Sequence, residues 1–144
     1  MSILETLRTP YVVHLLENNK MMENKKWIVN MSLEHMFEGS LVDLVNKFGG
    51  FFYKNLVRCY TRQLLLGPHY LHSHEIVHCH LKSKNVLVGL MRVKRADFGT
   101  TARLENICHN IKTGHCLKQM KRHMLVWVAP EVVRHKEQGS ASDI

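Results

Sequence analysis

Apolar and polar residues alternate in short blocks over the first third of the chain, and these blocks predict one helical turn followed by two strands. Residues 3–7 have helical spacing, and Pro10 ends that turn. Residues 11–16 and 27–33 are rich in β-branched and apolar side chains, which is typical of strands. The polar residues 18–26 between them predict a turn, so the two strands are expected to pair as neighbours.

The next element is a short helix with a recognisable start and end. Gly39 interrupts the preceding segment, and Ser40 has the side chain of an N-cap for a helix over residues 41–47. Gly49 and Gly50 then end the helix.

Residues 54–72 carry the longest helical pattern, with Leu56, Tyr60, Leu64 and Leu71 near one face. Pro68 lies inside this pattern. Proline removes a backbone donor and clashes with the preceding turn, at a cost of about 3 kcal/mol in a helix interior. We therefore expect a kink or local unwinding at Pro68.

The second half of the chain predicts shorter elements separated by polar turns. Short apolar runs at residues 76–77, 86–88 and 93–96 predict strands. Residues 106–122 have no clear period and predict a long basic loop, and residues 131–135 predict one short helix.

Composition limits the class of protein. The 144 residues have room for one ordinary domain, and 45% hydrophobic with 22% charged residues is typical of globular proteins. The sequence has no run near the roughly 20 apolar residues of a membrane helix, and residues 1–10 lack the order of a secretory signal. Four cysteines without a regular spacing are expected to be reduced thiols. We therefore expect a cytoplasmic or nuclear protein without a membrane partner.

Three strings in the second half carry candidate chemistry. The first runs from His78 to Asn85 and includes Lys82, the second is Asp97-Phe98-Gly99, and the third is Ala129-Pro130-Glu131. In this order and at these intervals they resemble the catalytic loop, the metal-binding triplet and the end of the activation segment of eukaryotic Ser/Thr protein kinases. Residues 4–13, 39–45, 57–67 and 70–89 look most like plant mitogen-activated protein kinase kinase kinases.

The resemblance implies an α+β, protein-kinase-like fold that is only partly present. Residues 1–33 would be a remnant of the small lobe, residues 34–39 the hinge, and residues 40–144 a portion of the helical lobe. The implied activity is transfer of the γ-phosphate of ATP to protein hydroxyls. The implied partners are a protein substrate or a member of a kinase cascade.

The resemblance also assigns roles to single residues. Asn85 and Asp97 would hold magnesium, since hard cations prefer oxygen ligands. Lys82 would steady the transferred phosphoryl group, while ATP itself would meet a pocket formed by Glu34, Met36 and Leu87. The residues expected to serve the structure are the hydrophobic spine Leu4, Leu15, His78 and Phe98, together with Glu131 and with Asp143 at the start of the central helix.

Departures from the family pattern argue against catalysis by this chain alone. His80 stands where the family places the aspartate that accepts the substrate proton, and loss of a general base typically costs about 10²–10⁴ in rate. His123-Met124 replaces the usual Gly-Thr. The glycine-rich loop and the strand lysine would lie before Met1, and the central helix would continue beyond Ile144. ATP and magnesium binding by this chain is therefore in question, and we expect a marginally stable, aggregation-prone protein.

Two hypotheses from different classes remain open. One is a Ser/Thr kinase in which His80 serves as a substitute base, and the other is a catalytically dead fragment or pseudokinase that acts by binding. Zinc is a further alternative, because His78, Cys79 and His80 lie together and Cys108-His109 precedes His115-Cys116, but the spacing is not that of a zinc finger. The net charge of +8 attracts anionic partners. Nucleic acid is not the expected one, because residues 112–122 lack interleaved aromatic side chains.

Overall fold

A computed structural model describes residues 3–106, 127–134 and 139–143. The chain combines helices and strands, so the α+β class predicted from the sequence is confirmed. Its helices are α1 (Ile3–Thr6), α2 (Leu41–Lys47), α3 (Lys54–Ser73) and α6 (Pro130–Val133), with the 3₁₀ helices η1 (Ser83–Asn85) and η3 (Ser140–Asp143). Its strands are β1 (Leu15–Glu23), β2 (Lys26–Leu33), β3 (Gly39–Ser40), β4 (Ile76–Val77), β5 (Val86–Gly89), β6 (Arg92–Arg95) and β7 (Ala102–Arg103).

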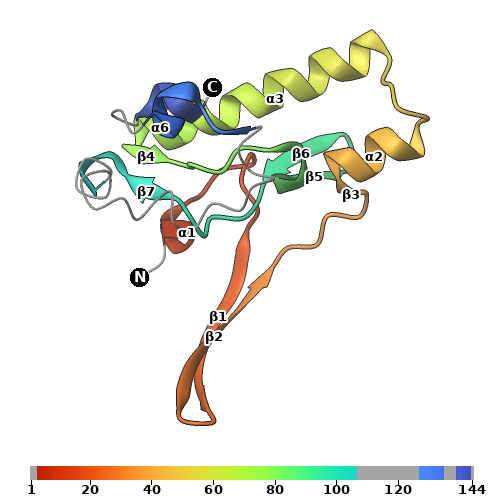
Figure 1. The fold of residues 1–144 in the computed structure, drawn as a ribbon. Helices are drawn as coiled ribbons and strands as arrows, with labels where there is room; N and C mark the ends of the chain where they lie inside the picture. Colours follow the sequence, from red (N-terminus) through yellow and green to blue (C-terminus); the bar gives the residue numbers. More distant parts are fainter. Residues whose placement is uncertain (1–2, 107–126, 135–138, 144) are drawn as a thin grey trace.

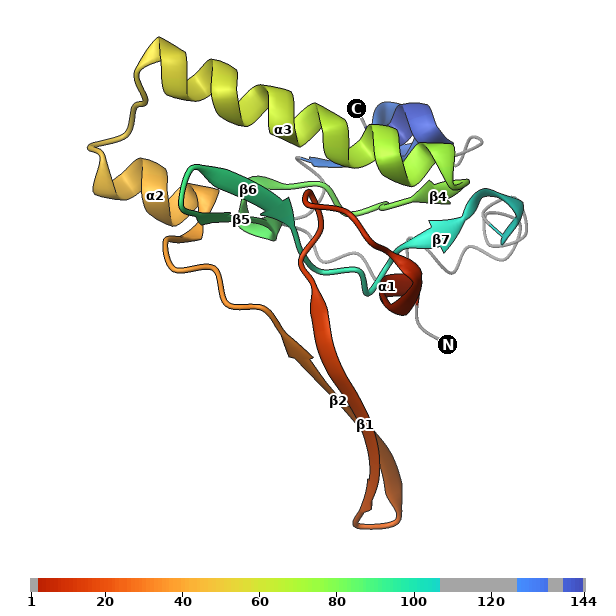
Figure 2. The same ribbon diagram turned by 180° about the vertical axis from the view of Figure 1, so that it is seen from behind.

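Strands β1 and β2 form an antiparallel hairpin that projects away from the rest of the fold in both views (Figures 1 and 2). Its turn is Asn24-Lys25, and both residues have positive φ angles of 49° and 61°. A two-residue turn of this conformation matches the twist of the strands, so the ladder continues almost to the turn. The bounds of the predicted strand at 11–16 are therefore wrong, since only residues 15–16 of it lie in β1, and the turn predicted at 18–26 is confined to Asn24-Lys25. The strand at 27–33 and its pairing are confirmed.

One face of this hairpin carries four apolar side chains, with Lys20 and Asn18 beside them. The register pairs Met22 with Trp27, and strand alternation places Val29 and Met31 on the same face as Trp27. These four side chains are 48–70% exposed. The opposite face carries mostly polar side chains, including the Asn19–Asn30 and Glu23–Lys26 pairs.

The main sheet has the order β3-β5-β6 and packs against α2 and α3. Its buried cluster comprises Leu44, Tyr60, Val86, Val88 and Val93. Because the cluster takes side chains from both helices and from both long strands of the sheet, it fixes the hairpin of β5 and β6 beneath α3.

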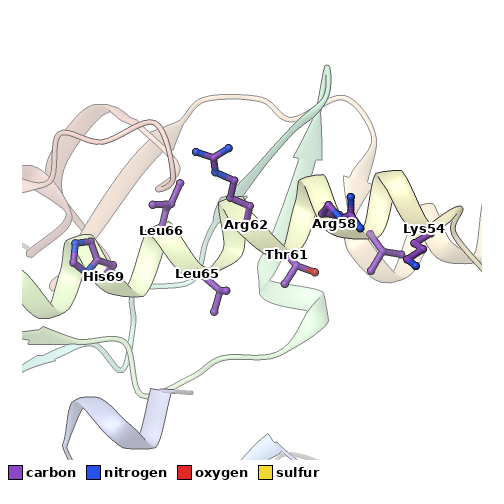
Figure 3. A pocket seen from close by; sticks show the side chains of 8 residues that line it. Lys54, Arg58, Thr61, Arg62, Leu65, Leu66 and His69 are labelled. Carbon is purple, nitrogen blue, oxygen red and sulfur yellow. The ribbon is translucent and has the colours of Figure 1, made fainter.

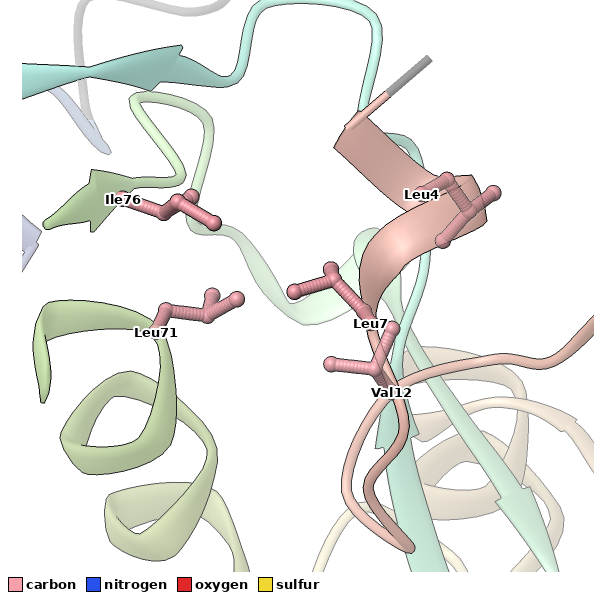
Figure 4. Close-up of a cluster of buried hydrophobic side chains, with 5 residues drawn as sticks. All are labelled: Leu4, Leu7, Val12, Leu71 and Ile76. Carbon is pink, nitrogen blue, oxygen red and sulfur yellow. The ribbon is translucent and has the colours of Figure 1, made fainter. Parts of the chain in front are cut away.

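A second buried cluster joins the N-terminal segment to the end of α3. It contains Leu4, Leu7, Val12, Leu71 and Ile76, whose side chains converge from α1, the segment before β1, α3 and β4 (Figure 4). Helix α1 agrees with the predicted turn over residues 3–7. Strand β4 pairs antiparallel with β7, which extends this side of the molecule.

Helix α2 begins as its sequence predicts. The Ser40 hydroxyl accepts a hydrogen bond from Asp43 N, and the Asp43 carboxylate accepts one from Ser40 N, which forms a capping box. Gly49 and Gly50 follow the helix with positive φ angles of 74° and 94°, a conformation that favours glycine.

Helix α3 runs unbroken through Pro68, so the predicted local unwinding is wrong. Pro68 cannot donate the hydrogen bond that the Leu64 carbonyl would receive four residues earlier in the helix. Arg95 supplies a replacement, because its Nη2 donates to Leu64 O at 2.7 Å. The helix is therefore completed from the neighbouring strand.

The remaining predictions have mixed outcomes. The strands at 76–77, 86–88 and 93–96 correspond to β4, β5 and β6. The short helix predicted at 131–135 is α6, which begins at Pro130 and ends at Val133. Most of the predicted basic loop, His123-Met124 and the second cysteine and histidine cluster lie outside the described residues. Within the described residues, α3 and the other helices are too short or too polar to cross a membrane.

Candidate functional site

The candidate site forms where the loop after β4 meets the end of β6. Strands β5 and β6 form a hairpin, and this hairpin returns the chain so that Ala96 N donates to Asn85 O at 2.8 Å. The next residue, Asp97, has a φ of +64°, which is unusual for a residue other than glycine. The turn brings its carboxylate to Asn85, whose Nδ2 donates to Asp97 Oδ2 at 3.2 Å.

Asn85 also holds the loop that precedes it. Its side chain is buried, and Nδ2 donates a second hydrogen bond to the carbonyl of His80 at 3.0 Å. Asn85 therefore ties Asp97 to the loop at His80.

His80 lies between the lysine and the aspartate of the site. Its Nε2 is 2.9 Å from Lys82 Nζ, and its Nδ1 is 3.2 Å from Asp97 Oδ2. An ammonium group can only donate, so Nε2 is the acceptor and the ring proton is assigned to Nδ1. The Nδ1–Oδ2 contact has the distance of an ion pair but not the alignment of a hydrogen bond, and Nδ1 is buried.

The surroundings of His80 favour its neutral form. Burial lowers the pKa of the imidazole, the positive charge of Lys82 lowers it further, and Asp97 opposes both effects. The net shift is downward. His80 is therefore a neutral ring at pH 7 whose accepting nitrogen is already occupied by Lys82.

His78 connects the candidate site to the buried core. Its side chain is fully buried, its Nε2 is 3.2 Å from Ala96 O, and its ring centroid is 4.8 Å from that of Phe98. Phe98 and Leu15 in turn pack against the cluster that contains Leu4. The structure thus brings the four predicted spine residues together around one core.

Asp143 anchors the same loop from the C-terminal end of the described chain. Its two carboxylate oxygens accept hydrogen bonds from His78 N at 2.7 Å and Cys79 N at 2.9 Å. His72 Nε2 lies 3.1 Å from Asp143 Oδ2. Cys79 has a φ of +63°, so the carboxylate stabilises a turn in an uncommon conformation.

Glu131 and Glu34 have partners that the sequence does not reveal. Glu131 Oε1 accepts from Ser142 Oγ at 2.6 Å. Glu34 Oε1 accepts from His14 N at 2.7 Å and from Lys94 Nζ at 2.5 Å. Burial raises the pKa of Glu34, but these hydrogen bonds lower it by more, so the net shift is downward.

The residues predicted to meet adenine lie around the segment between β2 and β3. Glu38 N donates to Val88 O at 3.0 Å, and Ser40 pairs with Leu87, so this segment runs beside β5. Met36 packs near Gly89, where an added Cβ would lie 3.2 Å from the Met36 Cε. Met36 and Leu87 therefore come from adjacent segments, while the Glu34 carboxylate points to Lys94.

Sequence reasoning missed Lys94, Arg95 and His72 as residues that hold the site. Lys94 and Arg95 occupy a strand in which every second side chain would ordinarily be exposed, yet both are buried. Their partners, Glu34 and Leu64, lie 60 and 31 residues away. His72 lies within residues 70–89, which carry the family resemblance, but only the fold reveals Asp143 as its partner.

The donor set suits a hard cation. Asp97 supplies carboxylate oxygens and Asn85 an amide oxygen, and magnesium is commonly held by one or two such groups plus phosphate oxygens and water. Within the described ranges, His, Cys, Asp and Glu do not form a cluster of three that could hold a metal ion by themselves. The site is therefore consistent with a metal that arrives with phosphate.

Comparison with known proteins adds independent findings. The family profile described as "Protein kinase domain" matches residues 1–144. Mitogen-activated protein kinase kinase kinase 17 of Arabidopsis thaliana is 34% identical over 144 residues, which cover 99% of this chain and 36% of the relative. Mitogen-activated protein kinase kinase kinase 2 of the same plant is 36% identical over 143 residues, or 99% of this chain and 20% of the relative.

A relative from a second organism gives the same kind of match. Mitogen-activated protein kinase kinase kinase A of Dictyostelium discoideum is 32% identical over 117 residues, which cover 81% of this chain and 12% of the relative. The chain thus spans about a third or less of the length of these three relatives.

Proposed function

This chain belongs to the protein kinase domain family, and we propose that its site holds metal-bound phosphates but has lost phosphoryl transfer, so that the protein acts by binding. The observation that carries the proposal is the 2.9 Å contact between His80 Nε2 and Lys82 Nζ. The proposal includes a partner of the kind that the relatives' names indicate, a protein of a kinase cascade. It also includes the division into a small-lobe part, a hinge at residues 34–39 and a helical-lobe part.

The close approach of Asn85, Asp97 and Lys82 supports the part of the proposal that concerns binding. Asn85 and Asp97 lie side by side, and Lys82 reaches the same group of residues through His80. We expect Asp97 and Asn85 to hold the metal, while Lys82 stays on His80 Nε2 and its positive charge attracts the phosphates. Magnesium, when bound, neutralises the charge on phosphates.

Loss of transfer follows from the state of His80. A general base must offer an unoccupied lone pair to the substrate hydroxyl, at a pKa near the working pH. His80 is neutral with its accepting nitrogen occupied by Lys82, and the pKa of its ring is lowered by burial and by that lysine. It also brings no negative charge to the place where a substrate hydroxyl would lose its proton. Both properties reduce the rate.

The second candidate is an active Ser/Thr kinase that uses His80 as its base. It is favoured by one observation, the contact between Nδ1 and Asp97, because a carboxylate stabilises the imidazolium that forms when a histidine accepts a proton. In this case Lys82 must leave Nε2 when phosphate binds, which frees the lone pair for the substrate.

Nucleotide binding and phosphate transfer by the full 144-residue chain separate the two candidates. Binding is measured with a fluorescent ATP analogue, with and without magnesium, and transfer with radiolabelled ATP and a general protein substrate. We expect magnesium-dependent binding that Asp97→Asn weakens at least about tenfold. Transfer by the wild-type chain should stay at background, and His80→Asp should raise it by about 10² or more, the usual contribution of a base.

Each half of the proposal has its own contrary result. Absence of magnesium-dependent binding by the wild-type chain would overturn the binding half. Transfer by the wild-type chain that His80→Ala abolishes would establish the active kinase instead. His74→Asp, a change at an exposed histidine, is the matched control for the added negative charge.

A further inference from the structure

The outer face of α3 carries a row of cations that have no acidic partner among the described residues. Lys54, Arg58 and Arg62 follow one another at intervals of four residues, and all three are exposed. Residues 54–73 contain no Asp or Glu. Among the described residues, each ion pair involves other cations, so the charge of this row is not balanced within that part of the chain.

This row borders an apolar groove. The groove has a volume of about 640 Å³, and beside the three cations it is lined by Val57, Leu65 and Leu66, with Thr61 and His69. Val57 is 46% exposed and Leu65 is 58% exposed. Figure 3 shows the labelled side chains along α3, with Lys54 and Arg58 toward one end of the helix and His69 toward the other.

The arrangement is unfavourable for an isolated helix. Like charges four residues apart repel each other. Leucine side chains that stay exposed contribute no free energy of burial. The buried face of α3 uses other residues, Tyr60, Gly67, Pro68 and Leu71, so the basic row is not needed for packing in the described fold. A face with both features is suited to a partner that brings negative charge and apolar side chains together.

We propose that this face of α3 docks an acidic amphipathic helix of a partner protein. Cations four residues apart recur every 6 Å or so along a helix, because the rise is about 1.5 Å per residue. Carboxylates at the same interval on a second helix would face them, while leucines beside those carboxylates would enter the groove. Helix pairs in proteins combine an apolar seam with flanking charge pairs in the same way.

The chemistry favours a protein over the other anionic surfaces. Membrane-binding basic clusters usually contain four to eight Lys or Arg and often include aromatic anchors, whereas this face has three cations and aliphatic side chains. Binding to single-stranded nucleic acid uses aromatic stacking, and the groove is lined by no Trp, Tyr or Phe among the described residues. The inference does not depend on phosphoryl transfer, because His80, Lys82 and Asp97 are not among the residues that line the groove.

The test is binding of a labelled helical peptide to the full chain by fluorescence anisotropy. The peptide carries Glu at i, i+4 and i+8 with leucines beside them. A control peptide has Gln at the three Glu positions. We expect saturable binding of the Glu peptide and at least about tenfold weaker binding of the Gln peptide, which corresponds to several exposed ion pairs. Raising the salt from low to high concentration should weaken binding, since exposed pairs are screened.

Variants locate the surface. Arg58→Glu with Arg62→Glu should weaken binding about tenfold or more, and Arg58→Gln with Arg62→Gln should weaken it less. Lys20→Glu with Lys25→Glu changes the same charge on the β1–β2 hairpin and should leave the affinity within about twofold. Circular dichroism melts establish that each variant remains folded.

Several results would overturn the proposal. Equal binding of the Glu and Gln peptides would remove the charge argument. Unchanged affinity in both the Glu and the Gln variants of Arg58 and Arg62 would place the peptide elsewhere. Tighter binding to phosphatidylserine vesicles or to a DNA oligonucleotide than to the peptide would assign the face to a membrane or to nucleic acid.

Discussion

Arg95 donates from Nη2 to the carbonyl of Leu64, and this hydrogen bond replaces the one that Pro68 cannot donate within α3. The guanidinium is buried, and burial lowers the pKa of Arg95 to about 10, against the opposing charge of Asp143. The close approach needs Gly67, where an added Cβ would lie 2.8 Å from Arg95 Nε. Gly67, Pro68 and Arg95 therefore act as one unit.

Replacement of Gly67 by alanine tests this unit. Alanine ordinarily stabilises a helix interior by about 0.5–1 kcal/mol relative to glycine. Here the new methyl group displaces a buried side chain, so we expect Gly67→Ala to destabilise the chain. In an Arg95→Met background the same change should be neutral or stabilising, and urea unfolding of the four variants in a double-mutant cycle measures the difference. Equal effects in both backgrounds would contradict the coupling.

The same unit shows where sequence patterns reach their limit. The helix over residues 54–72 and the capped helix at Ser40 were predicted because their signals are local: apolar spacing and a side chain near its own backbone. Local unwinding at Pro68 was predicted wrongly, because the donor that completes the helix comes from Arg95, which is 31 residues from Leu64. The extent of β1 was missed for a different reason. Polar residues form a regular strand there because both of its faces are largely exposed.

The candidate site likewise has parts that local sequence patterns predict and parts that depend on distant contacts. Lys82, Asn85 and Asp97 were recognised from ordered strings, and the structure brings them to one place. Neither the tautomer of His80 nor the hydrogen bonds of Asp143 could be predicted, because each depends on atoms placed by the return of a distant segment. Periodicity carries no information about such contacts.

Asp143 is predicted to stabilise the loop that contains His78 and Cys79. Removal of its carboxylate in Asp143→Ala leaves the backbone N–H groups of His78 and Cys79 without their acceptor. An unsatisfied buried donor costs about 1–3 kcal/mol, so we expect a loss of about 3 kcal/mol in the free energy of unfolding. Asp143→Asn keeps one carbonyl oxygen and should lose less. Chemical denaturation of the three proteins checks the order, and equal stability of the wild-type and alanine forms would refute it.

Lys82 is predicted to control the ionisation of His80. Its charge lowers the pKa of the imidazole after burial has already done so, and its ammonium occupies Nε2. In Lys82→Met the pKa of His80 should therefore rise, and Asp97 should then favour the charged ring. Nitrogen-detected NMR of selectively labelled histidine measures both the pKa and the tautomer. A protonated Nε2 in the wild-type chain at neutral pH would contradict the assignment.

The apolar face of the β1–β2 hairpin is predicted to drive self-association. Met22, Trp27, Val29 and Met31 are 48–70% exposed on one face, and a two-stranded hairpin also offers unpaired edges. Trp27→Lys with Val29→Lys should reduce the weight-average mass at high concentration in sedimentation experiments. Lys26→Glu changes charge on the opposite face and serves as the control. A wild-type chain that stays monomeric throughout the same range would count against this prediction.

His78 is predicted to make the fold sensitive to mild acid. Burial lowers the pKa of its imidazole from 6.5 to about 4, with Asp143 acting in the opposite direction. The unfolded chain therefore binds a proton that the folded chain excludes. The contribution of neutral His78 is complete above pH 6.5 and is lost as the pH falls from 6.5 through 4, at a slope of up to about 1.4 kcal/mol per pH unit.

Urea unfolding of the wild-type chain and of His78→Phe between pH 4 and pH 8 isolates this contribution. Phenylalanine keeps a ring against Phe98 but loses the contact with Ala96 O, so the variant should be less stable at pH 8. Because phenylalanine cannot titrate, the stability of the wild type relative to the variant should fall by roughly 3 kcal/mol toward pH 4, which makes the variant the more stable protein there. His74→Gln, at an exposed histidine, controls for the loss of an imidazole. A difference between wild type and His78→Phe that stays constant with pH would show that His78 is protonated in both states or in neither.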